Sequence, residues 1–154
     1  MKFESLNIVE PILRALSAKG YVTPSPIQER TIPLLLDSKD VIGIAQTGTG
    51  KTAAFVVPVL QKLHERSNGP RSKNPRALIL APTRELAIQI GMSFTDYGRF
   101  LNLKHLAVYG GVSIGPQIRT LQHGVDILIA TPGRLMDLMN QGKVNLSKVE
   151  FFVL

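Results

Sequence analysis

The sequence contains no cysteine and few charged residues, and both shortages limit what the protein can be. Without cysteine the chain has no disulfides, no cysteine-ligated zinc or iron–sulfur cluster and no thiol nucleophile. Charged residues make up 19% of the 154 residues, whereas 44% are hydrophobic. This composition supports a buried core and excludes wholesale disorder, and the length suits one domain.

Long hydrophobic stretches are also missing. The longest apolar run, residues 53–60, has eight residues, far fewer than the ~18 that a membrane helix needs. Glu4, Asn7 and Glu10 lie where a signal peptide would be apolar. We therefore expect a cytoplasmic protein with no membrane partner. An excess of 18 Lys and Arg over 11 Asp and Glu gives a net charge of +7, which permits an anionic partner without naming one.

The first thirty-six residues predict two helices. Asn7 can cap the first helix, with Glu10 at its third position, and Gly20 fits its end. One face of this helix collects the apolar side chains of Ile8, Ile12, Leu13 and Leu16. The second helix is predicted from Ser25–Pro26 to about Leu36, because proline is favoured at the first helical position after a serine cap.

From residue 41 onward, short apolar strands alternate with helical stretches. Strands are expected at 41–45, 77–81, 106–110, 126–130 and 151–154, and helices at 51–66, 84–99, 113–123 and 132–141. This alternation predicts an α/β fold with a parallel sheet. Residues 67–75 are expected to be a surface loop. The last strand has no turn or covering helix after it, so we expect the chain to be a piece of a longer protein.

The residues that follow the first expected strand, Ala45–Thr52, read A-Q-T-G-T-G-K-T. This is the phosphate loop G-x-x-x-x-G-K-[ST], with Ala45 in place of the first glycine. Gly48 and Gly50 allow backbone N–H groups to turn toward phosphate oxygens at the start of a helix. Lys51 can reach the β- and γ-phosphates, and the Thr52 hydroxyl can bind Mg²⁺. The alternative is a chance glycine-rich turn, which the strand before and the helix after make improbable.

Three further strand ends offer candidate anion sites on the same edge of the expected sheet. They are P-T-R-E-L-A from Pro82, the pair Gly110–Gly111, and T-P-G-R from Thr131. Each has an ordinary structural interpretation as a helix cap or a turn. Together they supply helix N-termini, bare glycine backbone and two arginines, Arg84 and Arg134. These groups are suited to bind the phosphodiester backbone of a nucleic acid without recognising its bases.

The N-terminal helices carry one more pattern, in which Phe3 precedes G-Y-V-T-P-S-P-I-Q, residues 20–28. Gln28 lies three residues after Ser25 and can close a capping box. Its amide can equally pair with the N6/N7 edge of adenine, and Tyr21 offers a ring for the base. The residues alone leave both interpretations open. Phe3 is interpreted as a packing residue.

These motifs resemble those of DEAD-box ATP-dependent RNA helicases. Phe3 with residues 20–28 resembles the Q motif, AQTGTGKT motif I, and PTRELA motif Ia; Gly110–Gly111 and TPGR resemble the GG and Ib elements. The match covers essentially the whole chain in the right order. The phosphate loop also resembles that of RecQ-type DNA helicases, but PTRELA and TPGR favour the RNA family.

The resemblance implies a three-layer RecA-like P-loop NTPase domain over residues 37–154, incomplete at its C-terminus, preceded by the Q-motif helices of residues 1–36. It implies ATP and Mg²⁺ as cofactors, with Lys51 and Thr52 as catalytic residues and Thr52 as the metal ligand. The implied ATP-binding residues are Phe3, Tyr21, Gln28, Ala45, Gln46, Thr47, Gly48, Thr49, Gly50, Lys51 and Thr52. The implied residues on the path of single-stranded RNA, bound without sequence preference, are Pro82, Thr83, Arg84, Gly110, Gly111, Thr131 and Arg134.

Parts of the family pattern are not in this sequence. The Asp-Glu-Ala-Asp motif, the Ser-Ala-Thr strand and the second RecA-like domain with its arginine finger are all absent. The acidic motif supplies the second Mg²⁺ anchor and positions the attacking water. We therefore expect the parent protein to be a helicase and ATP hydrolase, and this chain to bind nucleotide without hydrolysing it. A stand-alone nucleotide-binding module and a DNA helicase are the alternatives.

Overall fold

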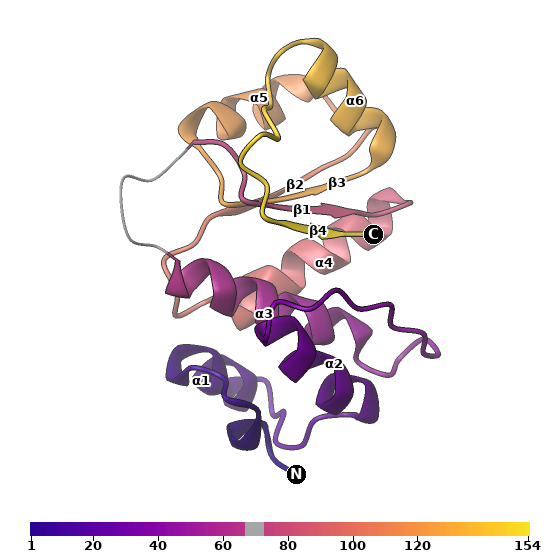
Figure 1. Ribbon diagram of the computed structural model, residues 1–154. Coiled ribbons are helices and arrows are strands. Elements are labelled where there is room, and N and C mark those ends of the chain that lie inside the picture. The colour runs from indigo at the N-terminus through magenta and orange to yellow at the C-terminus, as the bar shows by residue number, and fades with distance from the viewer. Residues whose placement is uncertain (67–72) are drawn as a thin grey trace. The chain divides into compact units, whose positions relative to one another are not determined.

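The computed structural model describes residues 1–66 and 73–154, which form two compact units (Figure 1). The helical unit comprises residues 1–66 and 93–102, and the sheet unit comprises residues 73–92 and 103–154. Helix α4 (Arg84–Tyr97) contributes to both. Among the described residues no helix is both long and apolar enough to cross a membrane.

The helical unit contains the 3-10 helix η1 (Phe3–Leu6) and the helices α1 (Glu10–Ala18), α2 (Pro26–Leu36) and α3 (Lys51–Glu65). Helix α2 packs on both η1 and α3. The fully buried side chains of Ile12, Ile32 and Leu63 lie in the core of the helical unit. Gln61 of α3 is also buried, and its side-chain amide bonds the backbone of Asn7 and Val9, at 2.9 and 3.0 Å. Helix α3 thereby fixes the segment that leads into α1.

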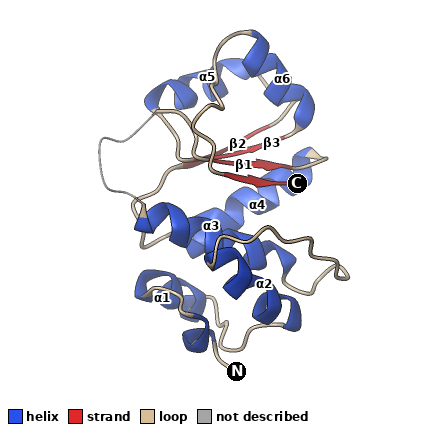
Figure 2. Cartoon of the chain, viewed as in Figure 1, coloured by secondary structure: helices blue, strands red, loops and turns tan. Residues whose placement is uncertain are grey.

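The sheet unit is built on four parallel strands in the order β2-β3-β1-β4. The strands are β1 (Ala77–Leu80), β2 (His105–Val108), β3 (Ile127–Ala130) and β4 (Phe151–Val153). Helices α5 (Ile114–His123) and α6 (Pro132–Asn140) follow β2 and β3. Figure 2 shows these strands in red with helices on both sides. The predicted α/β class and four of the predicted strands are confirmed.

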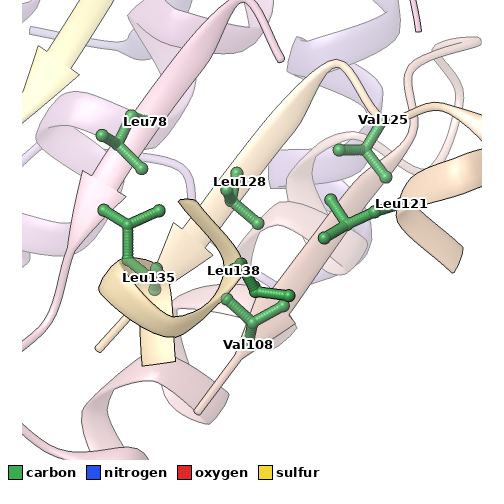
Figure 3. Close-up of a cluster of buried hydrophobic side chains, with 8 residues drawn as sticks. Leu78, Val108, Leu121, Val125, Leu128, Leu135 and Leu138 are labelled. Atoms are coloured by element: carbon green, nitrogen blue, oxygen red, sulfur yellow. The ribbon is translucent and has the colours of Figure 1, made fainter. Parts of the chain in front are cut away.

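The sheet unit has three layers. On one face, α5 and α6 cover a cluster of buried side chains from Leu78, Val108, Leu121, Val125, Leu128, Ala130, Leu135 and Leu138 (Figure 3). On the other face lies the part of α4 in this unit, where a Cβ on Gly91 would be 3.5 Å from the Ala107 side chain. Strand β3 is fully buried along its length, as expected of a parallel strand covered on both faces. Truncating Leu128 to alanine would cost about 2–5 kcal/mol of stability.

One predicted strand is wrong. Residues 41–45 form no strand, and Ile42 and Ile44 are 92% and 90% exposed. A strand is stable only when a neighbouring backbone pairs with its N–H and C=O groups, and no described strand pairs with this segment. Its apolar sequence alone therefore does not make it a strand here, and Figure 2 shows the connection from α2 to α3 as loop.

The predicted cap of the first helix is also wrong. Helix α1 begins at Glu10 with Val9 as its N-cap, and Asn7 instead ends η1 in a left-handed conformation, φ 60°. Pro11 gives the reason, because a start at residue 8 would make it the fourth helical residue, whose N–H is needed for the first helical hydrogen bond, to the Asn7 carbonyl. A start at Glu10 keeps it within the first turn. The end at Gly20, with φ 81°, is confirmed.

The remaining helices begin and end within two residues of their predicted bounds; α3, for example, was predicted at 51–66 and extends from Lys51 to Glu65. The expected surface loop 67–75 lies largely outside the described residues, since 67–72 are not among them.

Candidate nucleotide and phosphate sites

The phosphate loop turns on two glycines in the left-handed region. Gly48 has φ 81° and Gly50 has φ 86°, and Gly50 is the N-cap of α3. Side chains other than glycine rarely adopt this backbone conformation. The helix that follows presents the unpaired N–H groups and positive dipole end of its first turn, which favour an anion. Local geometry therefore supports phosphate binding here, even though the preceding residues form no strand.

Gln28 joins α2 to this loop. Its side-chain oxygen accepts a hydrogen bond from the Ser25 backbone N–H at 2.9 Å, and its side-chain nitrogen donates to the Gly50 carbonyl at 3.1 Å. The capping interaction predicted for Gln28 is thus present, and the same amide also holds the phosphate loop. A Cβ on Gly50 would collide with the Gln28 nitrogen. Glycine at position 50 is therefore favoured by its φ, and a side chain there would also displace the Gln28 amide.

The other loop residues are accessible. Lys51 is exposed, and its ammonium group donates to the Ala45 carbonyl at 2.5 Å across the loop. The Thr49 hydroxyl donates to the Gln46 carbonyl at 2.6 Å and closes the turn, while Gln46 and Thr47 are exposed. Because the Ala45 carbonyl is neutral, an anion in the loop would be a stronger partner for the charge of Lys51.

Mg²⁺ fits this site as an ion carried by phosphates. Thr52 lies in the first turn of α3 and is partly exposed. Among the described residues no group of three or more His, Asp or Glu side chains could hold a metal ion alone. Mg²⁺ is usually held by one or two protein oxygens together with substrate phosphates and water. Thr52 can supply one such oxygen.

The two aromatic residues of the predicted adenine site differ in exposure. Phe3 is 3% exposed, as expected of the packing residue it was interpreted to be, whereas Tyr21 is 47% exposed. The Tyr21 ring lies 6.1 Å from that of Tyr97, centroid to centroid. Burial, and next a hydrogen bond with Tyr21, raise the pKa of Tyr97 well above its ordinary value. Tyr21 is thus anchored by a neutral phenol and still offers ring surface to solvent.

In the sheet unit, the three other predicted anion sites follow strand ends that lie in register. Leu80 pairs with Ala130, and Val108 pairs with Ala130. The segments that begin at Pro82, Gly110 and Thr131 therefore leave one edge of the sheet, as predicted, and α4, α5 and α6 begin there. Pro82 and Gly110 are exposed and Thr131 is partly so.

Thr83 caps the start of α4, and the next residue, Arg84, lies beside the turn that follows β2. The Thr83 hydroxyl accepts a hydrogen bond from the Leu86 N–H at 3.1 Å, which confirms its capping interpretation. Arg84 is exposed, and its guanidinium lies 5.1 Å from the centre of the Tyr109 ring. Its Nη1 would be 3.4 Å from a Cβ on Gly111. A cation thus lies directly beside the glycine pair.

Arg134 occupies a different environment from Arg84. Its side chain is 9% exposed and donates to Gln117 Oε1 and to the Val112 carbonyl, both at 2.9 Å. Gln117 was not predicted as a site residue. The available signal was a glutamine within the apolar stripe of Ile114, Ile118 and Leu121, where a buried polar group needs partners.

The chain was next compared with known proteins. The sequence profile of the DEAD/DEAH box helicase family matches residues 25–154. The chain belongs to this family.

Its relatives share sequence over the whole chain. ATP-dependent RNA helicase DeaD of Escherichia coli (strain K12) is 46% identical over 153 residues, 99% of this chain and 24% of that protein. DEAD-box ATP-dependent RNA helicase CshA of Streptococcus pneumoniae serotype 4 is 46% identical over 154 residues, 100% of this chain and 28% of that protein. DEAD-box ATP-dependent RNA helicase 20 of Oryza sativa subsp. japonica is 42% identical over 153 residues, 99% of this chain and 31% of that protein. The DEAD/DEAH box chain thus spans about a quarter to a third of their length.

Proposed function

We propose that this chain is the nucleotide-binding part of an ATP-dependent RNA helicase, an RNA-dependent ATPase that locally separates short RNA duplexes. The observation that carries the proposal is the loop at the start of α3, in which Gly48 and Gly50 are left-handed and Gln28 holds the Gly50 carbonyl, in a chain of the DEAD/DEAH box family. The names of the relatives state ATP dependence and RNA helicase activity, which favours RNA over DNA.

In this proposal the nucleotide is bound from three directions. Backbone N–H groups of the loop and Lys51 hold the phosphates, and Thr52 supplies an oxygen to Mg²⁺, which neutralises phosphate charge when bound. Gln28 reads the adenine edge with the hydrogen-bonding capacity left on its amide, since its NH₂ group has two hydrogens and its oxygen two lone pairs. Tyr21 offers its exposed ring to the base. The remaining loop residues proposed to contact nucleotide are Ala45, Gln46, Thr47 and Thr49, with Phe3 packing beneath.

The RNA path is proposed to follow the strand ends of the sheet unit. Arg84 pairs with a phosphate, while the Gly110–Gly111 backbone and the N-termini of α4 and α6 bind neighbouring phosphates and sugars. Such contacts involve no base edge, so binding does not depend on sequence. The residues proposed for this path are Pro82, Thr83, Arg84, Gly110, Gly111, Thr131 and Arg134.

Turnover is proposed to require more than these 154 residues. The sequence contains no Asp-Glu-Ala-Asp motif, and phosphoryl transfer needs an acidic group to anchor Mg²⁺ and orient water. We infer that the parent protein supplies this motif and a second RecA-like domain, and that it acts in the cytoplasm. The nucleotide is then bound by this chain and hydrolysed only by the larger protein.

The test is ATP hydrolysis by the full-length parent protein with single-stranded RNA or single-stranded DNA of the same sequence. We expect stimulation by RNA and little by DNA, and no hydrolysis by the 154-residue chain. Equal stimulation by DNA would favour the DNA-helicase alternative. Tight ATP binding with no stimulation by either would favour a nucleotide-binding module.

A further inference from the structure

The turn from Tyr109 to Val112, between β2 and α5, is held at both ends by side chains from two helices. Gln117 of α5 donates its Nε2 to the Tyr109 carbonyl at 3.2 Å. Arg134 of α6 donates its Nη2 to the Val112 carbonyl at 2.9 Å. The two side chains also bind each other, since Arg134 Nη1 donates to Gln117 Oε1 at 2.9 Å. We call Gln117 and Arg134 the turn clamp.

We propose that Gln117 is a positioning residue for RNA, and that Arg134 acts through the turn clamp rather than by binding phosphate with its side chain. The clamp fixes the shape of the turn that carries Gly110 and Gly111, whose exposed backbone then meets the RNA sugar-phosphate chain. This inference rests on the proposed function and deepens it, because it explains how the turn that carries Gly110 and Gly111 is held in the conformation that binds RNA.

The Arg134 side chain is mostly buried and already hydrogen-bonded, so it is poorly placed to bind a phosphate. Its side chain is 9% exposed, two of its nitrogens bind Gln117 and Val112, and its Nε lies 3.8 Å from the Asp137 carboxylate. A phosphate would have to displace these partners and leave buried groups unpaired, which is unfavourable. Arg84, exposed beside Gly111, has no such constraint. The charge that meets phosphate is therefore assigned to Arg84.

The turn needs support because it contains two adjacent glycines. Gly111 has φ 79°, and a Cβ on Gly110 would meet no neighbouring atom within 4 Å. Glycine backbone has the greatest conformational freedom in the unfolded or loose state, so ordering it on binding is costly. Gln117, 8% exposed, uses both ends of its amide to hold the start of the turn and Arg134 at once. The conformational entropy of the turn is then lost when the protein folds rather than when RNA binds.

The test compares Gln117→Met with Gln122→Met. Methionine matches glutamine in length but has no amide, and Gln122 is an exposed residue of the same helix. The probe is a fluorescein-labelled ten-nucleotide oligouridylate, titrated with the chain at several salt concentrations. We expect Gln117→Met to bind about tenfold more weakly, with an unchanged slope of log affinity against log salt because no charge is removed. Gln122→Met should bind like the wild type.

Amide hydrogen exchange gives a readout that general destabilisation would not reproduce. In Gln117→Met we expect faster exchange confined to residues 110–112, with ADP affinity unchanged. Faster exchange throughout the sheet unit would mean that Gln117 only stabilises the fold and would overturn the inference. Wild-type RNA affinity in Gln117→Met would overturn it as well.

Two Arg134 variants test the same clamp from its other side. Arg134→Lys keeps the charge but loses the planar fork that reaches both partners, so we expect the weaker binding of Gln117→Met, and no additional loss in the double variant. Arg134→Gln should leave the salt slope unchanged; a slope smaller by about one would mean direct phosphate contact and would overturn the indirect role. Failure of the wild type to bind oligouridylate would instead reject the proposed RNA path on this chain, so the two failures are distinguishable.

Discussion

The Gln28 side-chain nitrogen lies 3.1 Å from the Gly50 carbonyl oxygen and donates a hydrogen bond to it. This bond joins the helix that carries the proposed adenine reader to the loop that carries the proposed phosphate site. The same Gly50 carbonyl accepts the Ala54 N–H of α3 at 3.2 Å. The position of Gln28 and the shape of the loop are therefore mutually dependent, and several predictions test that dependence.

Gln28→Glu separates capping from adenine recognition. Glutamate keeps an oxygen for the Ser25 N–H but loses the donor to the Gly50 carbonyl and to adenine N7. We expect a loss of selectivity for ADP over GDP in competitive titration, with about 1 kcal/mol lost from the free energy of unfolding. Selectivity retained at lower stability would leave Gln28 with its structural role alone.

Gly50→Ala tests the close approach of Gln28. The new methyl group would collide with the Gln28 amide at an unfavourable φ, so we expect a loss of about 2–3 kcal/mol in denaturant unfolding. Gly48→Ala is the matched control, since it has similar φ but open space, and should lose only about 1 kcal/mol. Combining Gly50→Ala with Gln28→Ala should recover the difference. Equal losses in the two single variants would show that Gln28 does not constrain the loop.

Lys51→Ala should weaken ADP binding about tenfold to a hundredfold. Lysine 51 is the one cation within residues 45–52, and charge-assisted bonds are worth about 1.5–3 kcal/mol. Isothermal calorimetry checks this, with Lys39→Ala as the control, because Lys39 is exposed and paired with Asp37. An ADP affinity unchanged in Lys51→Ala would reject its assignment to the phosphates.

Arg84→Gln should weaken oligouridylate binding and reduce its salt slope by about one, because one phosphate contact is lost. Arg119→Gln, an exposed position on α5, is the charge-matched control. Similar effects from both variants would indicate diffuse attraction to the +7 chain rather than a defined contact.

His105 predicts how stability depends on pH. Burial lowers the pKa of His105 below its ordinary value of 6.5, so the unfolded state binds its proton more readily than the folded state. Its contribution to stability is complete above pH 6.5 and declines as pH falls below that value. The free energy of unfolding of His105→Gln should therefore fall less between pH 7 and 5.5 than that of the wild type. Parallel curves for the two proteins would contradict this.

The sequence predicted elements well where local pattern and tertiary pairing agree. The apolar runs at 77–80 and 127–130 have strand neighbours on both sides, and they became β1 and β3. The equally apolar run at 41–45 lacks a described neighbour and is not a strand. Strand formation depends on a partner that may be distant in sequence, which a local pattern does not reveal.

The candidate sites show the same division. The phosphate loop was predictable because its glycine spacing is itself the conformational requirement, and Gly48 and Gly50 adopt it. The role of Gln117 was not predictable, because its partners Tyr109 and Arg134 are brought to it only by the packing of α5 and α6 on the sheet. Arg84 and Arg134 looked alike in sequence, but they differ in burial and in the groups that they contact.

The central claim, that this chain binds an adenine nucleotide through Gln28 and the phosphate loop, is tested most directly by calorimetric titration with ADP and with GDP. The wild-type chain should bind ADP with a clear preference over GDP, and Gln28→Ala should abolish that preference while the chain stays folded. A folded wild-type chain that binds neither nucleotide, or binds both equally, would contradict the account.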